Sequence, residues 1–344
     1  MERTGLLIVA PAWIGDMVMT HALIRWLHQQ QPDEAIDLLA PEWSAPLTQA
    51  MPEVRHTIPI PIGHGQLALT SRYRLGRQLR DHRYRQAIVL PNSFKSALIP
   101  FWATIPQRIG YVGEWRWGLL TEARKLDRRR WPRMVDRLVA LGCPSGSPLP
   151  HPLPLPLLQV DATAAAEVAR QQRLSPDRPL AILCPGAAYG PAKRWPLSHY
   201  GEVARHLTAT GWQVVILGSQ QEKPDGEQIQ TMSHHSVHNL AGQLSLAQSI
   251  ALLSRADLVI SNDSGLMHVA AALQRRLIAL FGSSDPYHTP PLSDQATILY
   301  RQLACSPCLR RDCRYGTLHC LTEIRPETII TLLHDPVYGI VSVH

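Results

Sequence analysis

The strongest chemical pattern in the sequence is the segment Ile260–Leu273, ISNDSGLMHVAAAL. An apolar run that predicts a strand ends in a polar turn, and a helix rich in small residues follows. Ser264 and Gly265 would place free backbone N–H groups at the helix N-terminus, where a phosphate can bind. Asp263 could bind sugar hydroxyls from the strand end. His268, one turn into the helix, could face the same anion or be a surface or core histidine.

A second candidate phosphate site lies between Pro185 and Pro196, directly after the apolar run Leu180–Cys184. Small residues in this loop expose backbone N–H groups, and Lys193 and Arg194 supply positive charge. The GxxxxGK[ST] spacing of a P-loop and the GxGxxG of a dinucleotide-binding turn are both absent from the sequence. An ordinary loop with a surface lysine is the alternative to a diphosphate site.

Asp16 is a candidate general base. It follows Gly15 at the start of a predicted helix, after the apolar run Gly5–Ala10. A carboxylate at this place can be a plain helix cap, worth about 1 kcal/mol. The same place is the carboxyl end of the first strand, where α/β proteins bind ligands, and an Asp in a cleft can accept a proton from an alcohol. Gly15 would let a substrate approach the backbone closely.

Four cysteines near the C-terminus, Cys305, Cys308, Cys313 and Cys320, form a compact cluster. Thiols at short spacings suggest a zinc site, but these spacers match no standard zinc ribbon. A local thiol cluster without metal is the alternative, and a cytoplasmic chain disfavours disulfides.

The sequence contains no Asp-x-Asp pair, the usual carboxylate pair that holds a metal on a diphosphate. The negative charge of a leaving diphosphate would then be met by Lys193, Arg194 and helix dipoles. We therefore expect no obligatory metal cofactor at this site.

The elements that must position these residues are short apolar runs that alternate with amphipathic stretches in both halves of the chain. This alternation predicts α/β architecture: two Rossmann-like domains with parallel sheets, which bind ligands in a cleft at the carboxyl ends of their strands. The predicted strands are Gly5–Ala10, Ala35–Ala40, Val54–Ile60, Gln86–Leu90, Leu180–Cys184, Trp212–Gly218, Asp257–Ser261 and Arg276–Phe281. The predicted helices are Met17–Gln31, Leu67–Asp81, Leu197–Thr210, Ser245–Arg255 and Ser264–Gln274.

A proline-rich stretch, CPSGSPLPHPLPLPLL at 143–158, separates the two halves. Proline fixes φ and has no N–H donor, so this stretch can form neither a helix nor a central strand. It predicts a semi-rigid connector. We therefore divide the chain into domains 1–158 and 159–344, and leave open a last helix that packs back on the first domain.

The excess positive charge is confined to the N-terminal half. The chain has 34 Lys+Arg against 27 Asp+Glu, but residues 1–158 hold 19 against 12, and residues 159–344 hold 15 of each. Arginines at 72–85 and 108–137 dominate the excess, with Trp102, Trp115, Trp117 and Trp131 in or near the second stretch. These stretches are either solvated helix faces or a basic, aromatic-flanked surface for a phosphorylated or membrane-bound ligand.

Other function classes are less consistent with the sequence. A pI near 9.3 suggests an anionic partner, but no nucleic-acid-binding motif is present. No apolar run approaches the roughly 18 residues that span a bilayer, and the run Leu6–Ala10 is too short for a signal peptide. We expect a soluble, cytoplasmic protein.

Five segments together resemble the bacterial ADP-heptose:lipopolysaccharide heptosyltransferases of glycosyltransferase family 9, over essentially the whole chain. The segments at 11–17, 289–292 and 91–96 are similar to the type II members in particular. Ala187 and Ala188 stand where type I members carry hydroxyl residues, which also favours type II. The segments are PAWIGDM at 11–17, PNSFKS at 91–96, KRWP at 193–196, NDSGLMH at 262–268 and FGSSDP at 281–286, the last continuing into TPPL at 289–292.

This resemblance implies a GT-B fold, with two facing Rossmann-like domains. The C-terminal domain would bind ADP-L-glycero-β-D-manno-heptose, and the N-terminal domain the phosphorylated heptosyl-Kdo2-lipid A acceptor. The enzyme would invert the anomeric centre and transfer heptose to the first heptose of the acceptor, at its 3-hydroxyl, without an obligatory metal, although Mg²⁺ stimulation stays open. It would work at the cytoplasmic face of the inner membrane and bind no nucleic acid. The alternatives are a type I or type III acceptor, or a sugar-nucleotide epimerase of the same architecture.

The resemblance also implies roles for single residues. Asp16 would deprotonate the acceptor hydroxyl, Glu222 would bind the adenosine ribose, and Leu244 would lie near the adenine. The implied acceptor-binding residues are Gly15, Asn92 and Lys95. The implied donor-binding residues are Lys193, Arg194, Glu222, Leu244, Asp263, Ser264, Gly265, Leu266 and His268.

Overall fold

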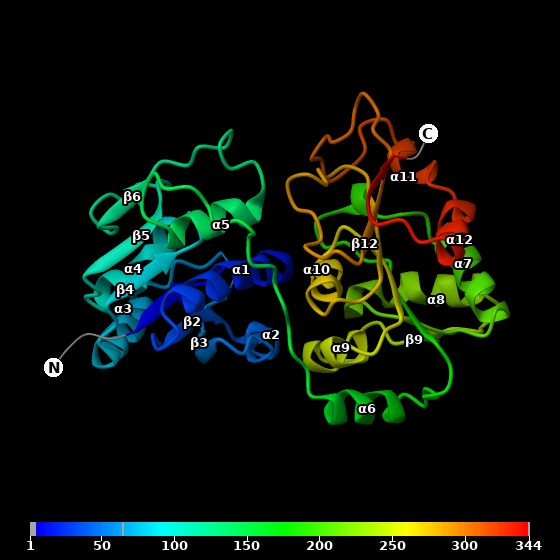
Figure 1. Cartoon of the computed structure of the whole chain (residues 1–344), viewed down its shortest axis with the longest axis horizontal. Coiled ribbons are helices and arrows are strands. Elements are labelled where there is room, and N and C mark those ends of the chain that lie inside the picture. Colours follow the sequence, from blue (N-terminus) through cyan, green and yellow to red (C-terminus); the bar gives the residue numbers. More distant parts are fainter. Residues whose placement is uncertain (1–4, 64, 343–344) are drawn as a thin grey trace. The chain divides into compact units, whose positions relative to one another are not determined.

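The computed structural model describes residues 5–63 and 65–342, which fold into two compact α/β units (Figure 1). The units divide between Pro156 and Leu157, inside the proline-rich stretch. Within the described part of the chain, no helix combines the length and the apolar character that crossing a membrane requires. Each unit has one sheet with all its strands parallel, so the predicted α/β class is confirmed.

The first unit has a six-stranded sheet in the order β3-β2-β1-β4-β5-β6. This is the strand order of a doubly wound dinucleotide-binding sheet. Its strands are β1 (Leu6–Val9), β2 (Ile36–Pro41), β3 (Val54–Ile60), β4 (Gln86–Val89), β5 (Gln107–Tyr111) and β6 (Glu122–Arg124). Its helices are α1 (Ile14–Gln30), α2 (Ala45–Gln49), α3 (Leu69–Gln78), α4 (Phe94–Trp102) and α5 (Met134–Gly142), with 3₁₀ turns at Glu42–Ser44 and Leu79–His82.

The second unit has a seven-stranded sheet in the order β13-β12-β11-β10-β7-β8-β9. Its strands are β7 (Leu180–Cys184), β8 (Gln213–Ile216), β9 (His238–Asn239), β10 (Leu258–Asn262), β11 (Leu277–Phe281), β12 (Ala296–Tyr300) and β13 (Gly339–Ser342). Its helices are α6 (Ala162–Gln171), α7 (Leu197–Ala209), α8 (Lys223–Met232), α9 (Leu246–Leu253), α10 (Gly265–Ala272), α11 (His319–Thr322) and α12 (Pro326–His334), with 3₁₀ turns at Pro191–Lys193 and Gln220–Glu222. The last helix, α12, packs against α7 of the same unit.

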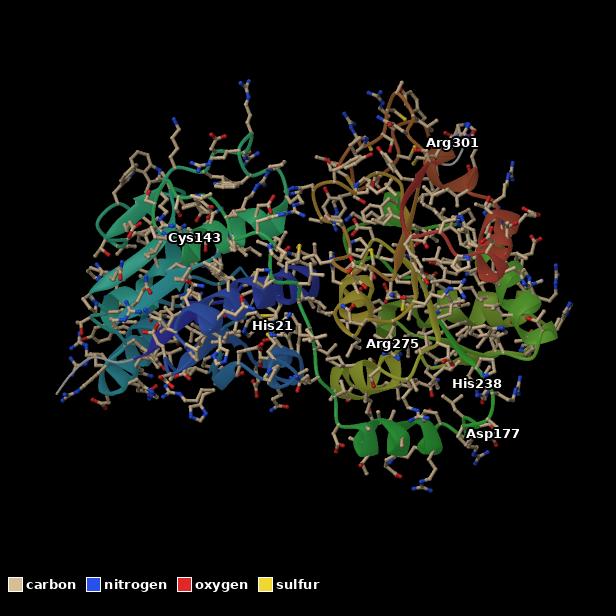
Figure 2. The ribbon with its side chains drawn as sticks, viewed as in Figure 1. His21, Cys143, Asp177, His238, Arg275 and Arg301 are labelled. Carbon is tan, nitrogen blue, oxygen red and sulfur yellow. The ribbon has the colours of Figure 1, made fainter. Side chains whose placement is uncertain are left out.

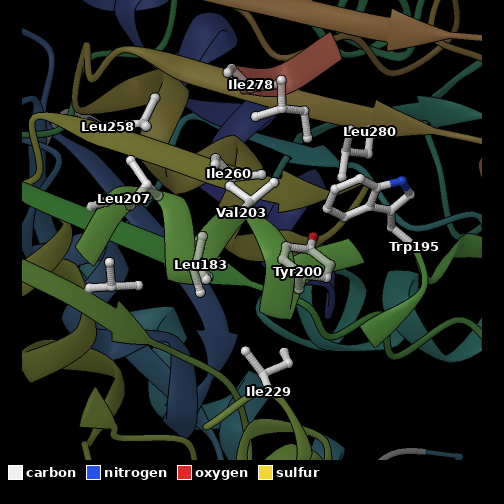
Figure 3. Close-up of a cluster of buried hydrophobic side chains, with 14 of the residues drawn as sticks. Leu183, Trp195, Tyr200, Val203, Leu207, Ile229, Leu258, Ile260, Ile278 and Leu280 are labelled. Atoms are coloured by element: carbon white, nitrogen blue, oxygen red, sulfur yellow. The ribbon is translucent and has the colours of Figure 1, made fainter. Parts of the chain in front are cut away.

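The central strands form because most of their residues are apolar, with Ser261 and Asn262 at the end of β10 as polar exceptions. Every residue of β7, β10 and β11 is buried, as expected for parallel strands that are covered on both faces. Side chains from these strands meet those of α7 in one hydrophobic cluster, which Figure 3 shows. Trp195 and Tyr200 lie in this cluster, with ring centroids 4.9 Å apart in an edge-to-face arrangement. Trp195 donates from its indole nitrogen to the carbonyl of Ile324 at 2.8 Å.

The helix that carries Asp16 is anchored to a neighbouring loop. His21, which Figure 2 labels, is fully buried in α1, and its Nε2 lies 2.7 Å from the carboxylate of Glu53. The guanidinium of Arg25, one turn further along, lies 3.3 Å from the same carboxylate. These contacts fix the rotation of α1, and with it the direction in which its first turn points.

Each sheet has one place where the strand order reverses. In the first unit it lies between β1 and β4, and in the second between β7 and β10, which pair as parallel neighbours. Connections leave such a pair toward opposite faces of the sheet, so a crevice opens at the carboxyl ends of the two strands. Most residues that the sequence marks as chemical follow these four strands, whereas Glu222 follows β8 and Leu244 follows β9.

Candidate active site

In the second unit, Lys193 and Asp263 meet beyond the carboxyl ends of β7 and β10. The ammonium of Lys193 lies 2.5 Å from the Asp263 carboxylate, and their side chains are only 18% and 6% exposed. His268 lies close to both and is 5% exposed. Burial lowers the pKa of His268 to about 4, with Asp263 acting to raise it and Lys193 to lower it. The imidazole is therefore neutral at pH 7, and the site holds one cation and one anion.

The N-terminus of α10 adds backbone donors to this group. Ser264 is the N-cap residue in an extended conformation, and its hydroxyl accepts from the N–H of Met267 at 3.4 Å. Gly265 and Leu266 begin the helix and are partly exposed. Unpaired N–H groups and the helix dipole at this end favour an anion.

Asn262 holds the two halves of this site together, a role that the sequence analysis did not assign. Its side-chain oxygen accepts from the N–H of Trp195 and from the Tyr200 hydroxyl, both at 3.1 Å. Its amide nitrogen donates to the carbonyl of Pro185 at 2.5 Å. Because Asn262 is fully buried, these bonds tie the loop that carries Lys193 to the strand end next to Asp263.

Glu222 reaches the same end of the sheet from the turn after β8. Its carboxylate accepts from the N–H and the hydroxyl of Ser219, at 2.7 and 2.9 Å. A Cβ at Gly186 would lie 1.9 Å from this carboxylate, so a larger residue in the loop after β7 would displace the Glu222 side chain. Leu244 is half-buried and directly precedes Ser245, the N-cap of α9.

Arg194 has a different partner. Its guanidinium lies 3.1 Å from the carboxylate of Asp225, in the first turn of α8. The structure therefore brings Lys193, Asp263 and His268 together, and gives Arg194 an internal partner instead.

The first unit contains a cavity of about 800 Å³ at the carboxyl ends of its first four strands. Its wall is mainly apolar, and its rim includes Trp13 and Trp43, which are 56% and 43% exposed. The cavity is lined by Val9, Ala10, Ala12, Trp13, Pro41, Glu42, Trp43, Ile60, Pro61, Ile62, Gly63, Gly65, Arg72, Pro91, Ser93, Lys95, Ser96 and Ile99. The sequence analysis did not connect Trp13 with Trp43, because they follow different strands.

The charged side chains in the cavity wall differ in availability. Arg72 is buried and donates to three backbone carbonyls, at 2.7 Å to Leu67 and at 3.3 Å to Lys95 and Gln66. Burial lowers the pKa of Arg72. Lys95, in the first turn of α4, is partly exposed, and its ammonium forms no ion pair within the described chain. Lys95 is therefore the cation that a ligand in this cavity can reach.

Asp16 and the predicted acceptor residues gather near this cavity. Asp16 lies in the first turn of α1, three residues after Trp13, and is partly exposed. Gly15 precedes it in the same turn. Asn92 is exposed after β4, and its side-chain oxygen accepts from Arg116 at 3.2 Å. These residues flank the reversal between β1 and β4.

Several arginines of the basic stretches form hydrogen bonds and ion pairs within the first unit. Arg80 donates to the carbonyl of Trp102 at 2.8 Å, and Arg85 pairs with Glu34 at 2.8 Å. Arg124 donates to the carbonyl of Ala140 at 2.7 Å. Neither interpretation of these stretches anticipated that so many guanidinium groups satisfy backbone carbonyls.

The four C-terminal cysteines gather around one small cavity of about 20 Å³. Burial raises the pKa of the Cys320 thiol to about 11, and the nearby Cys305, Cys308 and Cys313 act in the same direction. Backbone hydrogen bonds, chiefly from Leu318, lower the pKa of Cys313. All six cysteines of the chain are free thiols. Within residues 5–63 and 65–342, no group of three or more His, Cys, Asp or Glu side chains has an arrangement that could hold a metal ion.

Comparison with known proteins identifies the family. The protein-family model described as glycosyltransferase family 9 (heptosyltransferase) matches residues 72–319 of this chain. The chain belongs to glycosyltransferase family 9. This family 9 enzyme is 45% identical over 339 residues to lipopolysaccharide heptosyltransferase 2 of Salmonella typhimurium, covering 96% of this chain and 97% of that one. It is 44% identical over 338 residues to lipopolysaccharide heptosyltransferase 2 of Escherichia coli, with the same coverage.

A solved structure agrees with these relatives. The structure of E. coli ADP-heptose LPS heptosyltransferase II matches the family 9 enzyme with a TM-score of 0.86 and 42% identity, over 96% of this chain and 98% of that one. The predictions of a glycosyltransferase, of family 9 and of its fold class are therefore confirmed. The roles of single residues stay predictions.

Proposed function

We propose that this family 9 enzyme transfers L-glycero-D-manno-heptose from ADP-heptose to the first heptose of the lipopolysaccharide inner core. The observation that carries the proposal is the group of Lys193, Asp263 and His268 at the strand reversal of the second unit. It combines a cation for a diphosphate with a carboxylate for sugar hydroxyls. The names of the relatives at 42–45% identity supply the sugar and the acceptor.

The second unit binds the donor in this proposal. The Lys193 ammonium and the N–H groups at Ser264, Gly265 and Leu266 bind the diphosphate. When the diphosphate takes the Lys193 charge, the Asp263 carboxylate can accept hydrogen bonds from the heptose hydroxyls. Neutral His268 can donate to a donor oxygen without adding charge.

The adenosine lies toward β8 in this proposal. Glu222 accepts from the ribose hydroxyls, and Leu244 contacts the adenine. Arg194 contributes positive charge at longer range, since its guanidinium pairs with Asp225.

The first unit binds the acceptor, and the cavity of about 800 Å³ is large enough for sugar rings. Trp13 and Trp43 offer flat apolar faces, on which the C–H faces of sugars can pack. Lys95 pairs with an acidic group of the inner core, a carboxylate or a phosphate. Gly15 leaves room beside Asp16, and Asn92 offers an amide at the edge.

The proposed reaction inverts the anomeric centre in one displacement. The Asp16 carboxylate accepts the proton of the acceptor hydroxyl, while the oxygen forms a bond to the anomeric carbon of the donor. The bond from this carbon to the β-phosphate oxygen breaks, and ADP leaves with the electron pair. Lys193 and the α10 N-terminus stabilise the charge on the leaving ADP. The scheme requires no obligatory cofactor, and Mg²⁺ stimulation is compatible with it.

With this acceptor, the enzyme works at the cytoplasmic face of the inner membrane in our proposal. It binds no nucleic acid. The position of the acceptor hydroxyl, the 3-hydroxyl of the first heptose, is part of the same proposal.

Acceptors of defined length test the proposal. Purified enzyme is incubated with ADP-heptose and Kdo2-lipid A that carries no heptose, one heptose or two heptoses, and the products are weighed by mass spectrometry. We expect one heptose to be added only to the acceptor with one heptose. Addition to heptose-free Kdo2-lipid A, or a new nucleotide sugar without acceptor, would assign a type I transferase or an epimerase instead.

A further inference from the structure

Two tryptophan side chains on one loop of the first unit are exposed to solvent. Trp115 is 89% exposed and Trp117 is 68% exposed, on the loop that joins β5 to β6. Tryptophan gains more than most residues from burial, so two exposed rings on one loop make this loop a candidate contact surface. Neither ring lines the acceptor cavity.

The residue between them holds this loop in place. Arg116 is 2% exposed, and its Nε donates to the carbonyl of Tyr111 at 3.0 Å. Its terminal nitrogens donate to the carbonyl of Pro91 at 2.6 Å and to the side-chain oxygen of Asn92 at 3.2 Å. With the guanidinium buried in the body of the unit, the two neighbouring rings are held outward by the fold.

Unpaired cations emerge beside this loop. The N–H of Val112 donates to the carbonyl of Arg124 at 2.8 Å, so the loops after β5 and β6 leave the same end of the sheet side by side. In the second loop, Lys125, Arg128 and Arg129 are exposed, and their side chains form no hydrogen bond or ion pair within the described chain. Aromatic rings and free cations thus share one edge of the unit.

We propose that these two loops dock the first unit on an anionic phospholipid surface. Indole rings favour the interface between headgroups and acyl chains, and cations near the surface are attracted to anionic headgroups. Charge complementarity favours a lipid surface, because the cations of Lys125, Arg128 and Arg129 match a dense layer of negative headgroups. We call this surface the docking edge, and it consists of Trp115, Trp117, Lys125, Arg128 and Arg129.

The docking edge adjoins the acceptor cavity. Pro91, whose carbonyl accepts from Arg116, lines that cavity. Docking through this edge would therefore bring the cavity to the membrane. The inference rests on the proposed function in one respect, since it takes the acceptor to be a glycolipid.

Vesicle binding tests the inference without any turnover. The full-length enzyme is sedimented with vesicles of phosphatidylethanolamine and phosphatidylglycerol, and with phosphatidylcholine vesicles for comparison. We expect the wild type to bind the anionic vesicles more tightly. The double variant Trp115→Ser/Trp117→Ser should bind them at least about tenfold more weakly. The variant Lys125→Gln/Arg128→Gln/Arg129→Gln should bind about 100-fold more weakly, at roughly 1 kcal/mol for each cation.

A matched control separates the docking edge from exposed aromatics in general. Tyr287 is 59% exposed in the second unit, and Tyr287→Ser should leave vesicle affinity unchanged. The docking-edge variants should melt like the wild type, because they replace solvent-exposed side chains. If the tryptophan variant unfolds, the three-cation variant still tests the inference, since these three side chains form no hydrogen bond or ion pair within the described residues.

Two results would overturn the inference. The first is equal vesicle affinity of the wild type and both variants. The second is no vesicle binding by the wild type, together with a tryptophan-dependent dimer in sedimentation equilibrium, which would assign the docking edge to a second copy of the chain. Failure of the proposed function is distinguishable, because it would appear as absent heptose transfer even where vesicle binding follows the prediction.

Discussion

The ammonium of Lys193 and the carboxylate of Asp263 lie 2.5 Å apart, although 70 positions separate them in the sequence. Both side chains are largely buried, and the ring of Tyr189 lies 5.0 Å from the same ammonium. A buried ion pair holds its charges in place, and removing one partner leaves the other without compensation. We interpret this pair as the unliganded state of the donor site. In this state Lys193 pairs with Asp263, and on donor binding it pairs with the diphosphate instead.

Replacing Lys193 by alanine should weaken ADP-heptose binding by roughly 10- to 100-fold, since a charge-assisted hydrogen bond contributes about 1.5–3 kcal/mol. Titration calorimetry with ADP-heptose measures the effect. Arg170→Ala is the matched control, because Arg170 forms an exposed ion pair with Glu167 on α6. Unchanged donor affinity in Lys193→Ala would reject the phosphate role.

His268 should make the enzyme less stable in mild acid. Its pKa in the folded protein is about 4, below the ordinary histidine value of 6.5, because burial disfavours the charged ring. In the unfolded chain His268 therefore binds a proton near pH 6.5, whereas in the folded protein it does so only near pH 4. The stabilisation is fully present above pH 6.5 and is lost as the pH falls to 4, at most about 1.4 kcal/mol per pH unit and about 3 kcal/mol in total.

Urea unfolding of the wild type and His268→Gln between pH 7 and pH 4 measures this contribution. We expect the difference in unfolding free energy between the two proteins to change in favour of the variant as the pH falls, since glutamine cannot be protonated. Parallel pH profiles would show that His268 does not titrate as its burial requires.

Replacing Trp43 by alanine should raise the KM for the acceptor and leave donor affinity unchanged. A stacked aromatic ring contributes about 0.5–1.5 kcal/mol beyond its buried area, so we expect roughly a 3- to 10-fold or larger effect. The assay uses a water-soluble, deacylated acceptor. Trp115→Ala is the control, because Trp115 does not line the cavity. An equal KM in the wild type and Trp43→Ala would remove Trp43 from the acceptor site.

Cys313 should react with iodoacetamide faster than Cys320 near pH 7.5. Backbone donors lower the pKa of Cys313, whereas burial and neighbouring thiols raise that of Cys320 to about 11, and the thiolate is the reactive form. Timed alkylation followed by peptide mass spectrometry measures both rates. Similar rates at both positions would contradict these environments, and elemental analysis of the same preparation tests whether the thiols hold a metal.

The alternation of apolar runs and amphipathic stretches predicted the two parallel sheets correctly, because buried parallel strands are largely apolar. It missed β5, β6, β9, β12 and β13. β6 is only three residues long and includes Glu122 and Arg124, while β13 is exposed for most of its length. Edge strands are less apolar, so a pattern based on burial does not detect β6, β9 or β13. β12 is different, because it lies inside its sheet and is buried throughout.

Part of the candidate site could also be predicted, since ligands in such sheets bind where strands end. Lys193, Asp263 and His268 each follow a predicted strand, and the structure brings them together. What the sequence could not show is pairing at a distance, such as Asn262 with Pro185. It also could not show which arginines donate to carbonyls, because that depends on where unpaired backbone groups remain after folding.

The most direct test of the proposed transfer is ADP release from ADP-heptose by the wild type and by Asp16→Asn, with and without the mono-heptosylated acceptor. We expect release only with the acceptor. We expect Asp16→Asn to lose roughly 10²- to 10⁴-fold in kcat, the range for removal of a general base, while ADP-heptose affinity stays within a few-fold. Near-normal turnover by Asp16→Asn, or ADP release that does not depend on the acceptor, would contradict the account.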